Sequence, residues 1–346
     1  MTADTPLVTI VTPSYNQAAY LEHTLRSVLL QDYPAIEYLV VDGASTDASP
    51  AIIQRWAGQA PERLRWWVSE PDGGQAEAIN KGFRRARGQV LAWLNSDDVY
   101  LPGAVRRAVA ALQANPTAPL VFGDALTVDA PGRPLNRLRF GDWGLDDLLR
   151  FRVICQPAVF MRREALEQTG WVDPSYHFLL DHQLWVRLAR LAAPVYIGHG
   201  PFDPLAAARH HPAAKNLTLA GRVGEEIERL LAYLQTQPDL QPRLAAGRRQ
   251  IYGGAARLNA RYLLEGGLPG PALRAYLRAL SLWPAYAARH THRMLYALAC
   301  LAGLQAPLDR RRAARDAAHR RRLAAELRAS PAGPAWRDWP GVSLDD

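Results

Sequence analysis

The chain has 346 residues, a formal net charge of +8 and 49% hydrophobic residues, a composition typical of a globular protein with one large domain plus an appendage, or two modest domains. Only two cysteines occur, Cys155 and Cys300, which argues against a disulfide-stapled secreted scaffold and against a four-ligand Cys/His zinc module. The polar start, Met1–Pro6, lacks the pattern of a signal peptide, and the apolar run Leu295–Leu304 is too short to span a bilayer. We therefore expect a cytoplasmic protein.

Short β-branched apolar runs alternate with helical patterns along the N-terminal part of the chain. The runs predict strands at 7–12, 37–42, 64–69, 90–94, 120–124, 158–161 and 195–197. The patterns between them predict helices at 20–30, 50–57, 74–87, 102–115, 163–169 and 180–191. This alternation predicts an α/β fold with a mostly parallel sheet flanked by helices, and such sheets bind ligands at the carboxyl ends of their strands.

The chain changes character after about Asn216, where strand patterns cease. Helices are predicted at 219–235, 240–264, 271–282, 285–304 and 310–329. The last stretch is rich in Pro, Gly and Asp, which is typical of a loose terminus. The sequence therefore predicts an α/β domain over residues 1–215, a helical C-terminal appendage over 216–330 and a flexible tail over 331–346.

Two polar segments follow the first two predicted strands. In Thr12–Asn16, the ring of Tyr15 can stack on a flat base, or the segment is a plain turn with Asn16 as a helix cap. The loop that starts at Asp42 can accept a hydrogen bond from a base imide or a ribose hydroxyl, or it is a capping loop. No G-x-G-x-x-G follows any strand, which argues against a nicotinamide-binding domain.

The sharpest signal is Asn95-Ser96-Asp97-Asp98, directly after the fourth predicted strand. Paired carboxylates are costly to hold together without a cation. Mg²⁺ and Mn²⁺ are hard ions that prefer carboxylates, water and phosphate oxygens, so a metal here could neutralise a diphosphate. The alternative is an N-cap at Asp98 before the next helix.

Two further residues are candidates for chemistry. Asp181 lies in the first turn of a predicted helix, where it either complements the helix dipole or acts as a general base on an acceptor hydroxyl. His211 follows the last predicted strand, where it either completes a metal shell or makes a structural hydrogen bond.

Arginines are concentrated late in the chain, at Arg310, Arg311, Arg312, Arg315, Arg320, Arg321 and Arg322. They belong to an amphipathic, Trp- and Arg-containing run, Leu282–Arg322, which can contact an anionic membrane surface. The alternative is a solvated basic helix. No nucleic-acid recognition motif accompanies it, so no nucleic-acid partner is expected.

Four ordered segments of the chain resemble family 2 glycosyltransferases. They are VTIVTPSYNQAAYLEHTLRSVLLQDYP, YLVVDGASTDAS, SEPDGGQAEAINKGFRRARGQVLAWLNSDD and RREALEQTGWVDPSYHFLLDHQLWVRLA. The resemblance covers about residues 7–215 and implies a GT-A fold with inverting transfer from a nucleotide-activated sugar. The helical appendage lies outside it.

The resemblance also implies roles for individual residues. The donor would be bound by Pro13, Tyr15, Asn16, Asp42, Asp72, Asn80, Lys81, Asn95 and Ser96. The metal would be held by Asp97, with Asp98 and His211 beside it, and Asp181 would be the catalytic base. Two positions depart from the family pattern: Asn95 replaces the first aspartate of D-x-D, and Leu180 replaces the glutamate that often precedes the base.

The resemblance thus implies a hexosyltransferase-type enzyme that uses Mg²⁺ or Mn²⁺ and a UDP-sugar donor. Its acceptor would be a glycan or a lipid-linked hydroxyl in cell-surface polysaccharide or glycolipid synthesis, at the inner face of the cell membrane. The alternatives are a non-catalytic nucleotide- or glycan-binding relative, which the Asn95 departure favours, and a nucleotidyltransferase. The latter would be expected to carry a glycine-rich, basic first loop, which the sequence lacks after Thr12.

Overall fold

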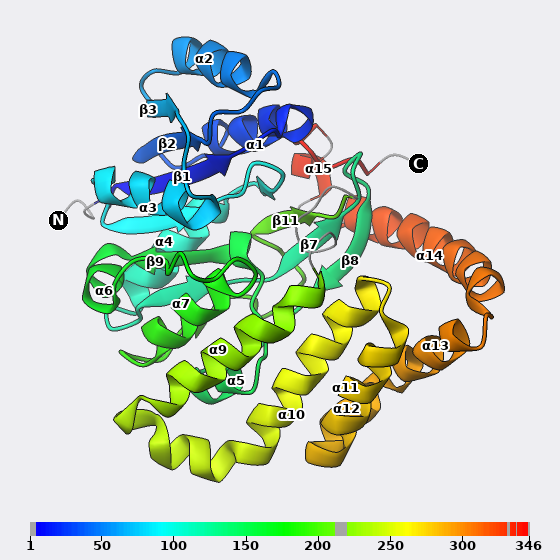
Figure 1. The fold of residues 1–346 in the computed structure, drawn as a ribbon. Coiled ribbons are helices and arrows are strands. Elements are labelled where there is room, and N and C mark those ends of the chain that lie inside the picture. Colours follow the sequence, from blue (N-terminus) through cyan, green and yellow to red (C-terminus); the bar gives the residue numbers. More distant parts are fainter. Residues whose placement is uncertain (1–4, 212–219, 331–332, 337, 345–346) are drawn as a thin grey trace. The chain divides into compact units, whose positions relative to one another are not determined.

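The computed structural model describes residues 5–211, 220–330, 333–336 and 338–344, and the chain forms two compact units (Figure 1). The first unit comprises Met1–Trp143, Ile154–His210 and His319–Asp346, and the second comprises Gly144–Val153 and His211–Ala318. The units are interleaved along the chain, unlike the consecutive domains expected from the sequence. The expected functional division into domains stays a prediction.

A seven-stranded sheet, in the order β10-β6-β9-β4-β1-β2-β3, forms the centre of the first unit. Its strands are β1 Val8–Ser14, β2 Ile36–Asp42, β3 Leu64–Ser69, β4 Val90–Trp93, β6 Leu120–Phe122, β9 Val159–Arg162 and β10 Val195–Tyr196. Only β9 runs antiparallel to its neighbours. Each strand overlaps a predicted one, because the central strands are β-branched runs buried on both faces.

Helices cover both faces of this sheet, as predicted. They are α1 Ala18–Leu29, α2 Ser49–Gln59, α3 Gln75–Arg85, α4 Ala104–Ala114, α6 Arg163–Thr169 and α7 Leu180–Ala189. Alternate strand residues point to opposite faces. Ile10 belongs to a core cluster with residues of α1, α2 and α4, whereas its neighbour Val11 packs on Gly82 of α3.

A second sheet in the same unit was not predicted. It has the order β5-β11-β7-β8, with strands β5 Val99–Tyr100, β11 Ala206–Arg209, β7 Ala125–Val128 and β8 Pro134–Leu138. These strands have two to five residues, and β11 is mostly alanine, so they carry too little alternating hydrophobicity for a sequence pattern.

The C-terminal segment packs on this second sheet, in contrast to the flexible tail expected over 331–346. The last turns of α14, Gln305–Arg328, and the short α15, Gly333–Trp336, lead into it. Trp336, Val342 and Leu344 are buried in one cluster with residues of β5, β7 and β11. The composition of the segment suggested disorder, but its few large apolar side chains gain a buried surface that the sequence pattern does not reveal.

The second unit is helical, as predicted for this part of the chain. Its helices include α5 Leu145–Leu149, α9 Val223–Gln235, α10 Gln241–Glu265, α11 Pro269–Leu282, α12 Pro284–Ala287 and α13 Thr291–Leu301. The single helix predicted at 285–304 is divided by a 3₁₀ turn at Ala288–His290. Across the described ranges, no helix combines the length and the apolarity needed to cross a membrane.

Candidate active site

The polar residues that follow the parallel strands lie along one edge of the first sheet. Ser14 at the end of β1 pairs in register with Asp42 at the end of β2. The loop Asn95–Asp98 follows β4, and Asp124 follows β6, which shares its direction with β4 because both are antiparallel to β9. The expected gathering of strand-end carboxylates is therefore present, while their roles in binding stay proposals.

Asp42 is a buried carboxylate held by two serines. Its side chain is fully buried; Oδ1 accepts a hydrogen bond from the Ser45 hydroxyl at 2.6 Å, and Oδ2 accepts from the Ser45 N–H at 2.9 Å and the Ser69 hydroxyl at 2.6 Å. A carboxylate has about four acceptor positions, so capacity for a ligand donor remains. The hydrogen bonds that Asp42 accepts within its loop are thus compatible with binding a nucleoside.

Asn16 links the loops after β1 and β2. Its backbone N–H donates to the Ser45 hydroxyl at 2.8 Å, and its side-chain carbonyl accepts from the Thr46 N–H at 2.9 Å. Its φ of 50° is a left-handed conformation that asparagine tolerates well. The N-cap of α1 is Gln17, without a side-chain capping bond, so the alternative of Asn16 as a helix cap is wrong.

Pro13 and Tyr15 differ sharply in exposure although they are two residues apart. Pro13 is buried within β1, opposite Val41 of β2. Tyr15 is 63% exposed immediately after the strand ends. An exposed aromatic ring at a strand end is available for stacking on a planar ligand.

Asp72 brings a second carboxylate to the Asp42 loop. Its Oδ1 accepts from the Gly74 N–H at 2.8 Å, and its Oδ2 lies against Gly43, where an added methyl group would be 3.0 Å away. Lys81, on the following helix, pairs with Glu70 at 2.9 Å. Because that ion pair is partly exposed, it holds the lysine only weakly.

Asn80, expected at the donor, is engaged in a structural contact. Its amide donates to the Val172 carbonyl at 2.8 Å and accepts from the Val172 N–H at 3.0 Å. The side chain is 5% exposed. Both of its polar groups therefore tie α3 to the segment before α7, and a donor contact of Asn80 stays a prediction without support from this geometry.

The loop after β4 is organised by the amide of Asn95. Its carbonyl accepts from the Gln75 amide at 2.8 Å, and its N–H donates to Oδ2 of Asp98 at 3.3 Å. Ser96 is buried beside it. An aspartate at position 95 would lack this donor and would add a third carboxylate, so asparagine suits a loop that already holds Asp97 and Asp98.

Asp98 is buried, and its Oδ1 accepts from the Arg209 backbone N–H at 2.9 Å. Burial and the neighbouring Asp97 carboxylate raise the pKa of Asp98 well above its ordinary value, and the hydrogen bonds from Arg209 and Asn95 oppose that rise. Helix α4 has Gly103 as its N-cap, so the alternative of Asp98 as a cap is wrong. A nearby cation would relieve the repulsion between the two carboxylates.

The donor set of this loop fits a divalent cation that is shared with a ligand. Among the described residues, no three His, Cys, Asp or Glu side chains cluster as a metal cage. Mg²⁺ is commonly bound by one or two carboxylates together with substrate phosphates, so Asp97 and Asp98 suffice once a diphosphate is present. Asp97 is half-buried, whereas Asp98 is buried and accepts two hydrogen bonds within the protein, so the role of Asp97 as the main metal ligand stays a prediction.

Asp181 lies in the first turn of α7, where its Oδ1 accepts from the His182 N–H at 2.6 Å. One turn later, Trp185 stacks on Trp93 at the end of β4, with 5.3 Å between ring centroids. Residues four apart share a helix face, so Asp181 lies on the face that α7 presents to the end of β4. Dipole complementarity and a catalytic role are both compatible with this position.

His211 is buried and begins the long segment of the second compact unit. Because it belongs to a different unit from the strand-end carboxylates, its place in a metal shell stays a prediction.

Sequence reasoning missed two residues that shape the site. Gln75 at the start of α3 holds Asn95, and Arg209 at the end of β11 contacts both aspartates of the loop. Gln75 lies in the third segment of the family resemblance, 20 residues before Asn95, but no role was expected of it. Arg209 lies outside the four segments and contacts Asp97 across 112 residues. The only local signal was the position of Arg209 next to the histidines His210 and His211.

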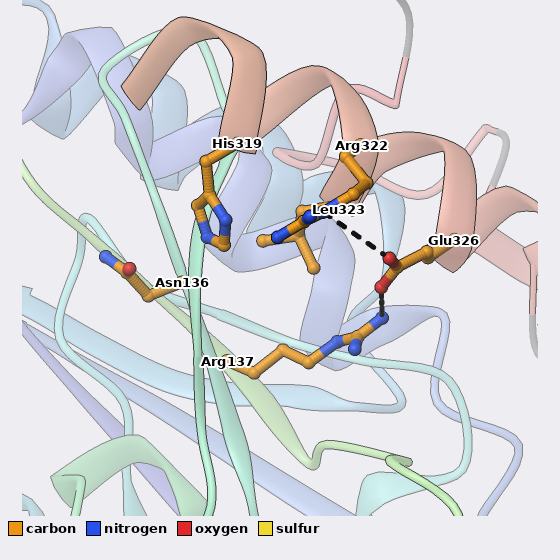
Figure 2. Close-up of a pocket in the computed structure, with 6 residues that line it drawn as sticks. All are labelled: Asn136, Arg137, His319, Arg322, Leu323 and Glu326. Atoms are coloured by element: carbon orange, nitrogen blue, oxygen red, sulfur yellow. Dashed lines mark ion pairs between the residues drawn. The ribbon is translucent and has the colours of Figure 1, made fainter. Parts of the chain in front are cut away.

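A groove elsewhere in the first unit contains none of these residues. Figure 2 shows its lining by Asn136, Arg137, His319, Arg322, Leu323 and Glu326, between β8 and α14. Glu326 pairs with Arg137 at 2.8 Å and with Arg322 at 3.8 Å. A single carboxylate therefore pairs with both arginines of this groove.

Comparisons with known proteins indicate the family of this chain. The model of the Glycosyl transferase family 2 matches residues 9–170. The chain is 33% identical over 217 residues to the O-antigen biosynthesis protein RfbC of Myxococcus xanthus, a match that covers 62% of this chain but only 17% of RfbC. It is 32% identical over 199 residues to the putative teichuronic acid biosynthesis glycosyltransferase TuaG of Bacillus subtilis, covering 57% of this chain and 77% of TuaG.

A solved structure shares the fold. The mannosyltransferase PcManGT from Pyrobaculum calidifontis, in complex with GDP-Man and Mn²⁺, superimposes with a TM-score of 0.58 at 21% identity, over 88% of each chain. The family match spans the segment that contains Asp42, the Asn95–Asp98 loop and Asp124, and the likeness to TuaG covers 77% of that glycosyltransferase. This chain therefore belongs to glycosyltransferase family 2.

Proposed function

We propose that this chain is an inverting glycosyltransferase that moves a sugar from a nucleotide-diphosphate sugar to a hydroxyl group. The acceptor is a glycan or a lipid-linked glycan of cell-surface polysaccharide or glycolipid synthesis, in line with the O-antigen and teichuronic acid biosynthesis for which RfbC and TuaG are named. The proposal rests above all on one observation: Asp42 and the Asn95–Asp98 loop share one edge of the parallel sheet, and α7 with Asp181 packs against the end of β4. Family membership excludes the nucleotidyltransferase alternative.

The nucleoside is bound by the loops after β1 and β2. The exposed ring of Tyr15 stacks on the base, and Asp42 accepts a hydrogen bond from the base or the ribose. Asn16 fixes the two loops against each other, and the Asp72 carboxylate lies beside Gly43. Rigid contacts of this kind lower the entropy cost of binding.

The diphosphate lies beside the loop after β4. Asp97, with Asp98 behind it, would hold the metal ion, and Asn95 and Ser96 shape the loop. A Mg²⁺ or Mn²⁺ ion, when bound, supplies positive charge for the diphosphate leaving group.

Asp181 acts as the general base. Its carboxylate takes the proton of the acceptor hydroxyl, and the oxygen attacks the anomeric carbon from the side opposite the diphosphate. The new bond forms as the bond to the diphosphate breaks, which inverts the anomeric centre. The stack of Trp185 on Trp93 fixes the helix that carries Asp181. The catalytic carboxylate is therefore held in a defined orientation.

A panel of nucleoside diphosphates and nucleotide sugars, with Mn²⁺ or with a chelator, tests the donor site by thermal unfolding. A ligand at about a hundred times its Kd stabilises the native state by about 2.7 kcal/mol, which raises the Tm by several degrees. We expect a Mn²⁺-dependent rise in the Tm with nucleotides of one base, and uracil is the first candidate. A flat response to every nucleotide with Mn²⁺ would contradict the donor site.

We further propose that the second unit contacts an anionic membrane, where lipid-linked acceptors reside. A leucine surface, defined as Leu268, Leu277, Leu295, Leu298, Leu301 and Leu304, contains six of the nine exposed large apolar side chains found among the described residues. It lies on α11 and α13, which pack on each other, and at their ends. Exposed arginines accompany it on the same helices, at Arg274 and Arg278, and this combination favours anionic lipid headgroups.

Replacing Leu295 and Leu298 together with serine should weaken binding to vesicles that contain anionic phosphatidylglycerol by about tenfold or more, because each buried leucine contributes about 1.5–3 kcal/mol. The control replaces Leu30 and Leu191, exposed leucines of the first unit, in the same way. Co-sedimentation measures the bound fraction. Equal binding by both double variants would argue against the leucine surface as the docking site.

A further inference from the structure

A buried arginine at the end of β11 holds the loop that carries the proposed metal ligand. Arg209 is 6% exposed, and its Nε donates to the backbone carbonyl of Asp97 at 2.9 Å. Its own backbone N–H donates to the carboxylate of Asp98 at 2.9 Å. One residue therefore fixes the main chain of the first aspartate and the side chain of the second.

The rest of the guanidinium is anchored to main-chain carbonyls elsewhere in the unit. Nη1 donates to the carbonyls of Asp129 and Ala130 after β7, at 3.0 and 2.8 Å, and Nη2 donates to the carbonyl of Gly341 at 2.8 Å. The guanidinium also lies over the Tyr20 ring of α1 at 5.2 Å. These partners are neutral, so the positive charge remains to act on the nearby carboxylates.

The Gly341 carbonyl is held in place by the C-terminal segment 333–344. The Trp339 indole N–H donates to the Tyr100 carbonyl at 2.6 Å, and the Ser343 N–H donates to the Gly132 carbonyl at 2.9 Å. The burial of Val342 on the second sheet completes the attachment. A segment more than 230 residues downstream of Asp97 thus supplies one wall of the arginine's binding site.

We propose that Arg209, anchored by the C-terminal segment, is a positioning residue that presents Asp97 to the metal–diphosphate of the donor. The inference rests on the proposed function, because it assigns a purpose to the geometry of that same loop. Outer-shell groups orient metal ligands in this way, and their loss weakens metal affinity without removing a ligand. The C-terminal segment then belongs to the donor site although it lies outside the family match.

A single methyl group tests the anchor. At Gly341, an added Cβ would be 2.8 Å from Nη2 of Arg209 and 2.8 Å from the Val99 side chain, so Gly341→Ala should displace the guanidinium. Gly303→Ala is the matched control. Its φ of +73° is nearly that of Gly341, +75°, and its Cβ would meet no atom within 4 Å, so both variants carry the same backbone strain. Arg209→Lys is a second variant that keeps the charge but loses the planar fork.

Two readouts are needed, and neither depends on turnover. Electron paramagnetic resonance of free Mn²⁺ gives the metal affinity in the presence of UDP or GDP, and hydrogen exchange without metal gives the protection of the amides in residues 95–98. We expect Gly341→Ala and Arg209→Lys to weaken Mn²⁺ binding by about tenfold or more and to speed exchange in this loop. Gly303→Ala should match the wild type in both.

The same measurements on Asp97→Ala separate this inference from the proposed function. Suppose Asp97→Ala loses Mn²⁺ binding while Gly341→Ala and Arg209→Lys bind Mn²⁺ like the wild type. The positioning role is then wrong and the donor site stands. A wild-type protein that binds no Mn²⁺ with either nucleotide would overturn both. If one of these two variants also shows faster hydrogen exchange throughout β1 and β2, its fold is lost. The other variant then tests the positioning role.

Discussion

Asp181→Asn is expected to lower the rate of sugar transfer by about 10²- to 10⁴-fold, the range over which a general base acts. Asparagine keeps the size of the side chain and can still accept the hydrogen bond from the His182 N–H. It cannot take up the proton of the acceptor hydroxyl. Because the proposed donor contacts lie on other loops, the affinity for the nucleotide should stay within about twofold of the wild type.

The release of nucleoside diphosphate from the nucleotide sugar measures this effect, alongside the Mn²⁺-dependent Tm rise as a check on donor binding. Asp173→Asn is the matched control. Asp173 precedes the same helix, and its carboxylate only accepts a hydrogen bond from the Ser175 N–H at 2.9 Å. Equal turnover in Asp181→Asn and Asp173→Asn would remove Asp181 from the mechanism.

Asp97→Ala is expected to lower turnover more than about a hundredfold at a Mn²⁺ concentration that saturates the wild type, since charge stabilisation by a bound metal ion contributes several kcal/mol. The loop should keep its shape, because Asn95 still bonds to Gln75 and the main chain at position 97 still accepts from Arg209. The loss should therefore reflect the missing ligand and not a collapsed loop.

A titration of turnover against Mn²⁺ concentration separates weaker metal binding from slower chemistry. Weaker binding shifts the curve to higher Mn²⁺, and added metal then restores part of the rate. Asp142→Ala, which removes an exposed carboxylate, serves as the control. A Mn²⁺ curve for Asp97→Ala that coincides with that of the control would show that the metal is not held by Asp97.

The first sheet could be predicted because its evidence is local. Runs such as Val8–Thr12 are β-branched, buried on both faces and bounded by turn residues, so the sequence locates each strand to within about two residues of its observed end. Once the strands are known to be parallel, the gathering of Asp42 and Asn95–Asp98 at one edge follows from the topology. The family resemblance then supplied the roles.

What could not be predicted depends on contacts between distant segments. Arg209 meets the Asp97 loop across more than a hundred residues, and the C-terminal segment reaches the second sheet from still farther away. Asn80 was assigned to the donor site because of its place in a family motif. Its amide N–H and carbonyl instead bond to the carbonyl and the N–H of Val172. No periodicity or turn signal encodes such pairings, because they exist only after the chain has folded.

The central claim is that the loop after β4 binds a metal–nucleotide complex through Asp97. Calorimetric titration of the nucleoside diphosphate chosen by the melting panel tests it most directly, with wild type and Asp97→Ala, each in Mn²⁺ and in chelator. We expect that Mn²⁺ strengthens binding to the wild type and that Asp97→Ala reduces this gain by about tenfold or more. The same affinity in Mn²⁺ and in chelator, for both proteins, would contradict it.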